Sequence, residues 1–380
     1  MTGNRKTRII VGMSGGVDSS VAALTLLGQG YDVHGLFMFN WEDDEPAYCT
    51  AAQDFEDARG VCDGLDIPLH RANFAREYRE RVFRRFLDGY AAGRTPNPDV
   101  LCNRHIKFGA FLRYARRLGG QRIATGHYAR LCSDGGRVRL LKGRDAAKDQ
   151  SYFLHAVAPA ALKSALFPLG DLEKREVRQI ALEQGFANCA KPDSTGICFI
   201  GERPFGEFLA RFLPARPGII QTADGEPVGK HAGAFLYTLG QRHGLGLGGR
   251  SGAGEAPWYV AATDIESNVV VVVQGHDHPL LRRRTLIAAG LRWVAGKPPA
   301  SRFRCHARSR YRQPDQACEV EILEGGRVLV RFERAQRALT RGQYVVFYVG
   351  DECLGGGAIE RVLPAADPAT VSATSRAAAC

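Results

Sequence analysis

Two glycines and three serines stand within seven residues near the start of the chain, in Ser14-Gly15-Gly16-Val17-Asp18-Ser19-Ser20. A short apolar run of strand type precedes the stretch, and good helix formers follow it as far as Gly28. Glycine lets backbone N–H groups approach an anion closely, and a helix that begins here directs its positive dipole end at the same point. With three hydroxyl donors added, the stretch predicts a phosphate-binding loop.

The type of phosphate loop follows from comparing patterns. Neither GxxxxGK[ST] with its lysine nor GxGxxG with a later acidic residue occurs here. The stretch instead resembles the SGGxDSS loop of ATP pyrophosphatases, which split ATP into AMP and pyrophosphate in order to adenylate a substrate. A plain glycine–serine turn is the alternative. The loop alone indicates a reaction type and no substrate.

Two cysteines stand in polar segments rich in turn-forming residues. Cys102 lies in 95–104, which we expect to be a rigid loop opening a helix near Lys107, and Cys198 lies between Gly196 and Gly201. A thiol near a helix N-terminus and basic side chains has reason for a lowered pKa, so Cys102 is a candidate for thiolate chemistry. A structural thiol is the alternative for each. The ten cysteines include no CxxC, so neither a zinc site nor an iron–sulfur cluster is predicted.

The elements that must position these residues alternate between strand and helix patterns from residue 8 to about 200. Alternation of this kind predicts a doubly wound parallel sheet, which binds ligands at the carboxyl ends of its strands. Met13, Met38–Phe39 and Gly126–His127 should therefore converge on the phosphate loop. We expect strands at 8–13, 32–39, 67–70 and 122–128, and helices at 21–27, 51–64, 74–93, 107–118, 159–167 and 174–184.

The alternation stops after residue 201. A short helix at 204–213 precedes a small β-rich unit, and we interpret its glycine-rich run at 238–249 as a flexible linker or an RNA-facing loop. Later strands around 317–349 predict an antiparallel barrel. The expected domains are 1–201 for nucleotide binding, 202–280 for the central unit and 281–363 for the barrel, with a disordered tail at 364–380.

Charge gives an independent indication of the partner. The formal net charge is +11, and 282–313 holds ten Lys or Arg and no Asp or Glu, with Trp293, Phe303 and Tyr311 interleaved. Such a stretch indicates a nucleic-acid surface, with a solvated basic face as the alternative. No apolar run has the length of a membrane span, and the first residues do not form a signal sequence. We expect a cytoplasmic protein without a membrane partner.

Seven longer motifs carry a resemblance that covers nearly the whole chain. In this order the chain resembles the bacterial tRNA-specific 2-thiouridylase family, within the PP-loop ATP pyrophosphatase superfamily. The motifs are GMSGGVDSS at 12–20, TPNPDVLCNRHIKFG at 95–109, ATGHYAR at 124–130, KDQSYFL at 148–154, DSTGICFIG at 193–201, TLGQRHGLGLGG at 238–249 and RYRQ at 310–313.

The resemblance implies ATP- and Mg²⁺-dependent transfer of sulfur to position 2 of the wobble uridine, residue 34, of tRNAs for Lys, Glu and Gln. It implies that Cys102 is the nucleophile, that Cys198 carries a persulfide from a sulfur-donor protein, and that Asp99 does acid–base work. ATP would contact Gly12, Met13, Ser14, Gly15, Gly16, Val17, Asp18, Ser19, Met38 and Gly126. The target base would meet Asn97, Pro98 and Asp99, and the tRNA would meet His127, Lys148, Asp149, Gln150, Arg310, Tyr311 and Gln343.

This chemistry is consistent with the residues. A pyrimidine 2-oxygen leaves poorly until it is adenylated, and sulfur must then arrive as a soft nucleophile. Cys102 can attack a persulfide on Cys198 and leave a Cys102–Cys198 disulfide, which a reductant must open. The order of sulfur release and attack on the base stays open. The target base must leave its stack, which makes a basic tRNA-binding surface useful. A monomer is expected.

Three alternatives remain. A ligating or amidating PP-loop enzyme, such as a lysidine or nucleotide synthetase, would keep its activity without both cysteines. An iron–sulfur sulfurtransferase would need clustered cysteine ligands. A non-catalytic tRNA-binding protein would bind tRNA regardless of ATP.

Overall fold

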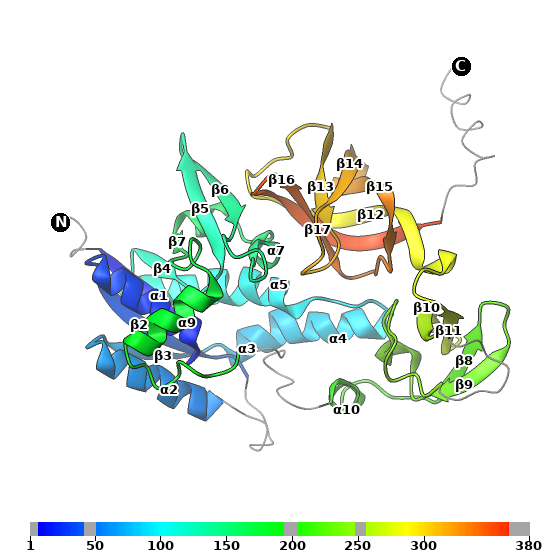
Figure 1. The fold of residues 1–380 in the computed structure, drawn as a ribbon, viewed down its shortest axis with the longest axis horizontal. Helices are drawn as coiled ribbons and strands as arrows, with labels where there is room; N and C mark the ends of the chain where they lie inside the picture. Colours follow the sequence, from blue (N-terminus) through cyan, green and yellow to red (C-terminus); the bar gives the residue numbers. More distant parts are fainter. Residues whose placement is uncertain (1–6, 42–50, 194–203, 248–255, 365–380) are drawn as a thin grey trace.

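The computed structural model describes residues 7–41, 51–193, 204–247 and 256–364. Within these ranges the chain forms three parts, which Figure 1 shows as a blue-to-green α/β domain, a yellow-green central sheet and a yellow-to-red barrel. Cys198, the tail beyond Pro364 and the first six residues lie outside the described ranges. The predicted fold class is confirmed: a parallel α/β domain, a small β-rich unit and an antiparallel barrel follow one another.

The α/β domain is built on a five-stranded sheet in which every neighbouring pair is parallel. The strand order is β3-β2-β1-β4-β7, so the order reverses between β1 and β4, where such sheets open a crevice for ligands. The strands are β1 (Arg8–Met13), β2 (Asp32–Phe39), β3 (Leu69–Asn73), β4 (Arg122–Ala124) and β7 (Ala165–Leu166).

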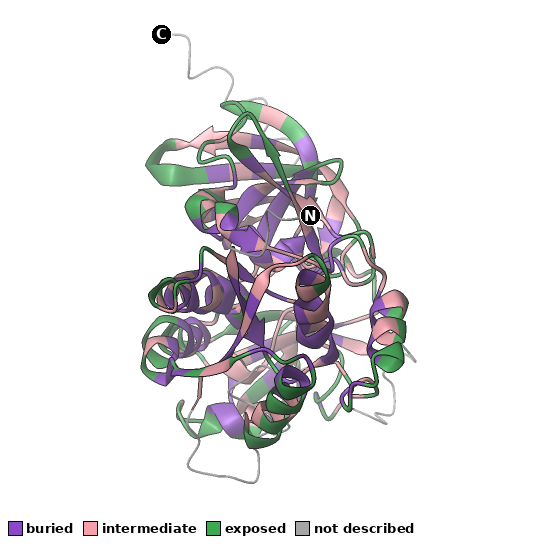
Figure 2. Ribbon diagram, turned by 90° about the vertical axis from the view of Figure 1, so that its left-hand side faces the viewer, coloured by how far each residue is buried: buried purple, intermediate pink, exposed green. Residues whose placement is uncertain are grey.

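Helices cover both faces of this sheet, and the burial pattern in Figure 2 follows the layers. Ile9 and Val11 of β1 pack against α1 (Val17–Gly28), α2 (Ala51–Gly64) and α9 (Lys174–Glu183). Ile10 points to the opposite helical layer. Because both faces are buried, β1 is apolar throughout rather than alternating.

The opposite layer contains the predicted helix 74–93. It forms as three consecutive segments, with a π-helical segment in the middle. Phe86, at 0 % exposure, belongs to the cluster that this layer buries. The segments are α3 (Ala75–Tyr78), Arg79–Phe83 and α4 (Arg84–Ala91), and the small helices α7 (Ser151–Leu154) and α8 (Pro159–Lys163) lie in the same layer.

Residues 95–104 do not form the expected loop. Helix α5 (Pro98–Cys102) begins at Pro98, because the Asn97 side chain accepts the N–H groups of Asp99 at 3.1 Å and Val100 at 3.3 Å. It continues through the π-helical segment Asn103–Phe111 into α6 (Leu112–Arg117). The prediction of a helix starting near Lys107 is therefore wrong, since the proline opens the helix instead of preceding it.

Two further expectations fail at the edge of the sheet. The helix expected over 159–167 ends at Lys163, and the chain then forms β7. The strand expected over 122–128 ends at Ala124, and residues 129–142 form an unpredicted hairpin of β5 (Ala129–Asp134) and β6 (Arg137–Lys142). Gly135 and Gly136, both with positive φ, form its turn.

The central unit is a four-stranded sheet of order β10-β11-β8-β9, reached through α10 (Phe205–Ala210). The described part of the glycine-rich run lies against this sheet. Gly240 donates its N–H to the Val260 carbonyl at 2.8 Å, and Val260 donates to Gln241 at 3.0 Å. It is therefore no linker between domains. The strands are β8 (Gly218–Thr222), β9 (Pro227–His231), β10 (Trp258–Asp264) and β11 (Val269–Gln274).

The C-terminal barrel closes because β12 pairs with both β15 and β17. Its interior is apolar, with Leu286, Val320, Val330 and Phe347 fully buried. Hairpin β5–β6 joins the outside of the barrel sheet, where Leu140 and Leu141 pair with Cys353 and Glu352. The strands are β12 (Arg282–Trp293), β13 (Arg302–Arg308), β14 (Gln316–Leu323), β15 (Arg327–Arg337), β16 (Tyr344–Val349) and β17 (Glu352–Leu363).

No helix within the described ranges combines the length and the apolar character that crossing a bilayer demands.

Candidate nucleotide and sulfur-transfer site

The loop between β1 and α1 has a conformation that requires glycine. Gly15 has φ +74°, and a Cβ at this position would overlap the backbone of Asp54 in α2. Gly16 is the N-cap residue of α1, and Asp18 lies in the first helical turn. The predicted strand–loop–helix unit is present, and its backbone N–H groups stand at a helix N-terminus.

Serine side chains hold this loop in shape. Ser19 accepts the Ser14 N–H at 3.2 Å and donates to the Gly16 carbonyl at 2.9 Å. Ser20 donates to the same carbonyl at 3.1 Å. Ser19 and Ser20 are buried whereas Ser14 is exposed, so Ser14 is the serine whose hydroxyl faces solvent. The loop is preorganised before any anion binds.

The neighbouring strands bring the other predicted nucleotide residues to the loop. A Cβ on Gly12 would lie 3.7 Å from the Met38 side chain and 3.6 Å from Phe111. A Cβ on Gly126 would lie 2.8 Å from the backbone of Asp18. The buried side chains of Met13 and Val17 belong to the core, which leaves their backbone groups for a ligand. The expected convergence at the carboxyl ends of β1, β2 and β4 is found.

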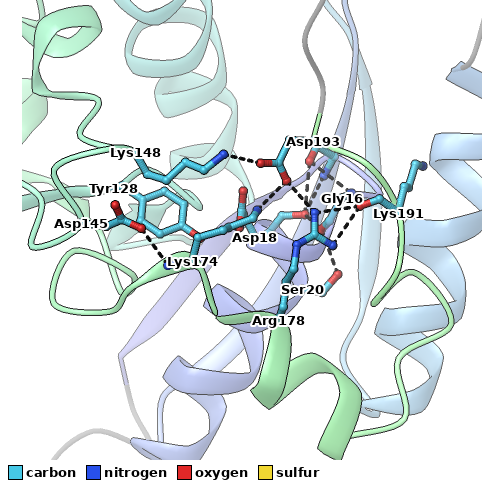
Figure 3. A network of polar contacts seen from close by, with 12 residues as sticks. Gly16, Asp18, Ser20, Tyr128, Asp145, Lys148, Lys174, Arg178, Lys191 and Asp193 are labelled. Atoms are coloured by element: carbon cyan, nitrogen blue, oxygen red, sulfur yellow. Dashed lines mark hydrogen bonds and ion pairs between the residues drawn. The ribbon is translucent and has the colours of Figure 1, made fainter. Parts of the chain in front are cut away.

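Beside the loop lies a network of ion pairs that the sequence analysis missed (Figure 3). Lys174, at the start of α9, places Nζ 2.7 Å from Asp18 and 2.7 Å from Asp193. Asp193 also accepts from Lys148 at 2.6 Å and Arg178 at 3.0 Å. Three cations therefore surround one carboxylate next to the phosphate loop.

A fourth cation, Lys191, adjoins the other side of the loop. Lys191 binds Asp54 at 2.6 Å and Asp57 at 2.5 Å in α2. Asn188 donates to the Gly15 carbonyl at 2.9 Å and to Ser20 at 3.0 Å, so it fixes the loop from behind. The basic residues Lys174 and Arg178 near the start of α9 were a sequence signal for the ion pairs with Asp18 and Asp193, but these partners are not adjacent to them in the sequence.

The Asp193 carboxylate stays ionised at neutral pH. Partial burial opposes ionisation of Asp193, but hydrogen bonds from Lys148 and Lys174 lower its pKa to about 2. Burial and the Asp18 charge raise the pKa of Tyr128, whose hydroxyl donates to Asp18 at 2.7 Å. The Asp18 carboxylate is thus held between a neutral donor and an ammonium group.

The helix beyond the loop carries Asp99 and Cys102. Asp99 is exposed, and desolvation by nearby protein atoms raises the pKa of its carboxyl group although the Lys107 charge opposes the rise. Cys102 is the last residue of α5 and is 6 % exposed. Because the helix begins at Pro98, Cys102 lies within the helix and not in a loop that precedes it.

Cys198, and with it the expected Cys102–Cys198 disulfide, lies outside the described residues. Of the motif at 193–201 the structure describes Asp193 alone.

Asp149 and His127 are buried, whereas Lys148 and Gln150 are partly exposed. Asp149 is 2 % exposed, and it accepts from the N–H groups of Gly143 and Ser151 and from Arg308. Gln150 accepts the Tyr128 N–H at 3.1 Å. His127 is 6 % exposed, its Nδ1 lies 2.7 Å from the Thr125 hydroxyl, and burial lowers its pKa well below the usual value.

The barrel residues expected to meet tRNA lie where the barrel contacts the α/β domain. The Tyr311 ring lies 4.4 Å from Phe153 of α7, measured between ring centroids. Gln343 donates to the Thr95 carbonyl at 3.0 Å, two residues before Asn97. Arg310 donates to the Arg337 carbonyl. Tyr311 therefore lies beside α7, and Gln343 lies beside the residues that lead into α5.

A five-stranded parallel sheet of this order, with a glycine–serine phosphate loop after its first strand, defines an α/β nucleotide-binding protein of the PP-loop class. Family models match three stretches. They are described as a tRNA methyl transferase HUP domain at 7–202, a tRNA methyl transferase PRC-barrel domain at 206–274 and an aminomethyltransferase beta-barrel domain at 283–359.

Curated relatives give the family more closely. The chain is 59 % identical over 359 residues to the tRNA-specific 2-thiouridylase MnmA of Marinobacter nauticus, covering 93 % of this chain and 91 % of the relative. It is 58 % identical over 362 residues to that of Chromohalobacter salexigens, covering 95 % and 94 %. The chain belongs to the family of tRNA-specific 2-thiouridylases, which are tRNA sulfurtransferases.

Proposed function

We propose that this protein uses ATP to replace the 2-oxygen of the wobble uridine of tRNA with sulfur. The observation that carries the proposal is the packing of the helix that bears Asp99 and Cys102 against the carboxyl ends of β1 and β4, beside the PP-loop. Phe111, further along that helix, approaches Gly12 at the end of β1, and the ring of Phe108 lies 6.0 Å from that of His127. An activated base and a sulfur nucleophile would meet there.

ATP fits the residues present around the loop. Gly15 has the positive φ that this loop needs, Gly16 is the N-cap of α1, and Lys174 and Arg178 supply positive charge beside the loop. Met38 and Gly126 border the loop at the ends of β2 and β4, where we place the adenosine. The Asp18 carboxylate is the group that would hold Mg²⁺, which neutralises phosphate charge when bound.

Adenylation makes the oxygen a leaving group. The uridine 2-oxygen attacks the α-phosphorus of ATP, and pyrophosphate departs. Sulfur then attacks C2 of the base, and AMP leaves with the former 2-oxygen. We assign the target base to Asn97, Pro98 and Asp99 at the start of α5. The raised pKa of Asp99 suits a carboxyl group that exchanges protons near a substrate.

We assign the sulfur route to Cys102 and Cys198. A sulfur-donor protein loads Cys198 as a persulfide, and Cys102 Sγ attacks the Cys198 sulfur. The terminal sulfur leaves as hydrosulfide toward C2, and the resulting Cys102–Cys198 disulfide is opened by an external thiol. Direct attack of the persulfide on C2 gives the same product, with the disulfide forming afterwards.

The tRNA contacts follow from charge and position. We propose that wobble-uridine tRNAs, those for Lys, Glu and Gln, lie along 282–313 of the barrel, with contacts at His127, Lys148, Asp149, Gln150, Arg310, Tyr311 and Gln343. Because Asp149 and His127 are buried, we expect them to shape this contact from beneath. We place the protein in the cytoplasm, whose reducing conditions suit the thiol cycle, and propose that it acts as a monomer.

The test is nucleoside mass spectrometry of unmodified tRNA incubated with the protein, ATP, Mg²⁺ and a cysteine desulfurase with its sulfur source. Wild-type protein should form 2-thiouridine only with ATP, and Cys102→Ser and Cys198→Ser should form none. AMP formation without sulfur in the base would favour the ligase alternative, as would activity in the absence of both cysteines.

A further inference from the structure

Asp193 occupies a position that is built for an anion. Its two carboxylate oxygens receive hydrogen bonds from three cations: Lys148 at 2.6 Å, Lys174 at 2.7 Å and Arg178 at 3.0 Å. Lys174 is only 8 % exposed, so its charge is committed to this place in the fold. Forked guanidinium and ammonium donors around one oxyanion are the donor set that proteins use for phosphate.

The position adjoins the phosphate loop. The same Lys174 Nζ that binds Asp193 lies 2.7 Å from Asp18, which is in the first turn of α1 (Figure 3). Arg178 donates in addition to the Lys191 carbonyl, and Lys191 Nζ lies 3.5 Å from the Gly15 carbonyl. Within the cation group of Lys148, Lys174 and Arg178, Lys174 therefore contacts the first turn of α1 directly, and Arg178 is linked to the loop through Lys191.

The net charge of this group indicates how a bound phosphate would affect Asp193. Lys148, Lys174 and Arg178 carry three positive charges, whereas Asp18 and Asp193 carry two negative charges, which leaves a balance of +1. Adding phosphates beside an ionised Asp193 would crowd like charges, but moving Asp193 away would raise the balance to +2. A phosphate group and the Asp193 carboxylate thus compete for the same donors.

We propose that Lys174 and Arg178 form the second half of the phosphate site, and that Asp193, which Lys148 also binds, is an internal anion that ATP must displace from it. The proposal rests on the proposed function. Phosphate oxygens take over the donors of Lys174 and Arg178, and the carboxylate turns to solvent. Because Lys148 is also a predicted tRNA contact, the exchange frees an ammonium group for the tRNA when ATP is bound.

Binding of inorganic pyrophosphate and of ATP, each measured by titration calorimetry without tRNA, tests the exchange. Asp193→Asn should bind both ligands more tightly, on the order of fivefold, since a competing ion pair has been removed. Lys174→Gln should bind both more weakly. Asp171→Asn, a matched change at a side chain 82 % exposed, should bind like the wild type.

The sign of the Asp193→Asn effect separates the proposal from damage to the fold. Misfolding can only weaken binding, and circular dichroism will show whether the variant is folded. Unchanged or weaker binding by folded Asp193→Asn overturns the internal anion. Failure of the wild-type protein to bind ATP or pyrophosphate would instead overturn the proposed function, so the two failures are distinguishable.

Discussion

Arg308 of the barrel reaches the carboxylate of Asp149 in the α/β domain at 2.8 Å. The side chains are 13 % and 1 % exposed, so this ion pair is buried between two parts of the chain. Arg308 also binds Asp315, and Lys142 of hairpin β5–β6 binds the same Asp315. The barrel is therefore joined to Asp149, the residue that follows Lys148 of the cation group.

Substitution of Arg308 should lower the free energy of unfolding more than substitution of an exposed arginine does. Arg308→Met leaves a buried carboxylate without its cation, and we expect the free energy of unfolding to fall by about 3 kcal/mol. Arg327→Met, which breaks an exposed pair with Glu360, should cost at most about 1 kcal/mol. Urea denaturation of both variants measures the difference. Equal decreases in unfolding free energy would show that the Arg308–Asp149 pair stabilises the protein no more than an exposed ion pair.

Gly15→Ala should abolish pyrophosphate release. The substituted residue would need φ near +74° and would overlap the backbone of Asp54, so the loop must move out of its anion-binding shape. Gly28→Ala is the control, because open space surrounds that position and its φ is not positive. There we expect normal pyrophosphate release and stability raised by about 0.5 kcal/mol. Full activity of Gly15→Ala would refute the role of this glycine.

The ion pairs of Asp193 should stabilise the protein in a pH-dependent way. The pKa of Asp193 is about 2 in the fold against 3.8 ordinarily, so the carboxylate contributes stability above about pH 4 and loses it as the pH falls toward 2. The difference in unfolding free energy between wild type and Asp193→Asn should thus be smaller at pH 3 than at pH 6. A pH-independent difference would contradict the lowered pKa.

Arg310→Ala should weaken tRNA binding and reduce its salt dependence. A guanidinium that contacts phosphate contributes about one unit to the slope of log K against log salt concentration. Filter binding of one unmodified tRNA at several salt concentrations measures the slope, with Arg327→Ala as the control on the barrel surface. An unchanged slope would leave Arg310 as a partner of the Arg337 carbonyl alone.

The sequence predicts best the elements whose pattern depends on burial alone. β1, β2, α2 and α9 lie where their apolar periodicity places them, to within a residue at each end. The PP-loop is also local, because β1, the glycines and α1 follow one another directly. These features needed no knowledge of distant contacts.

The misses have two physical causes. Asn97 and Pro98 are compatible with either a turn or the start of a helix, and in the structure the Asn97 side chain caps a helix that begins at Pro98. The cation group could not be predicted because its pairs are distant: Lys174 and Asp18 are 156 residues apart, and Lys148 and Asp193 are 45 apart. Sequence spacing carries no information about such pairs.

The pairing of β6 with β17 limits how this protein can be cut or recombined. The barrel sheet continues into a hairpin that belongs to the α/β domain, through Leu141–Glu352 and Leu140–Cys353. Excising the barrel would leave the backbone N–H and C=O groups of β6 that face β17 without partners, and an exposed strand edge of this kind promotes aggregation. A chimera that exchanges barrels between relatives must therefore carry the hairpin with the barrel, so the functional modules do not coincide with contiguous segments of the gene.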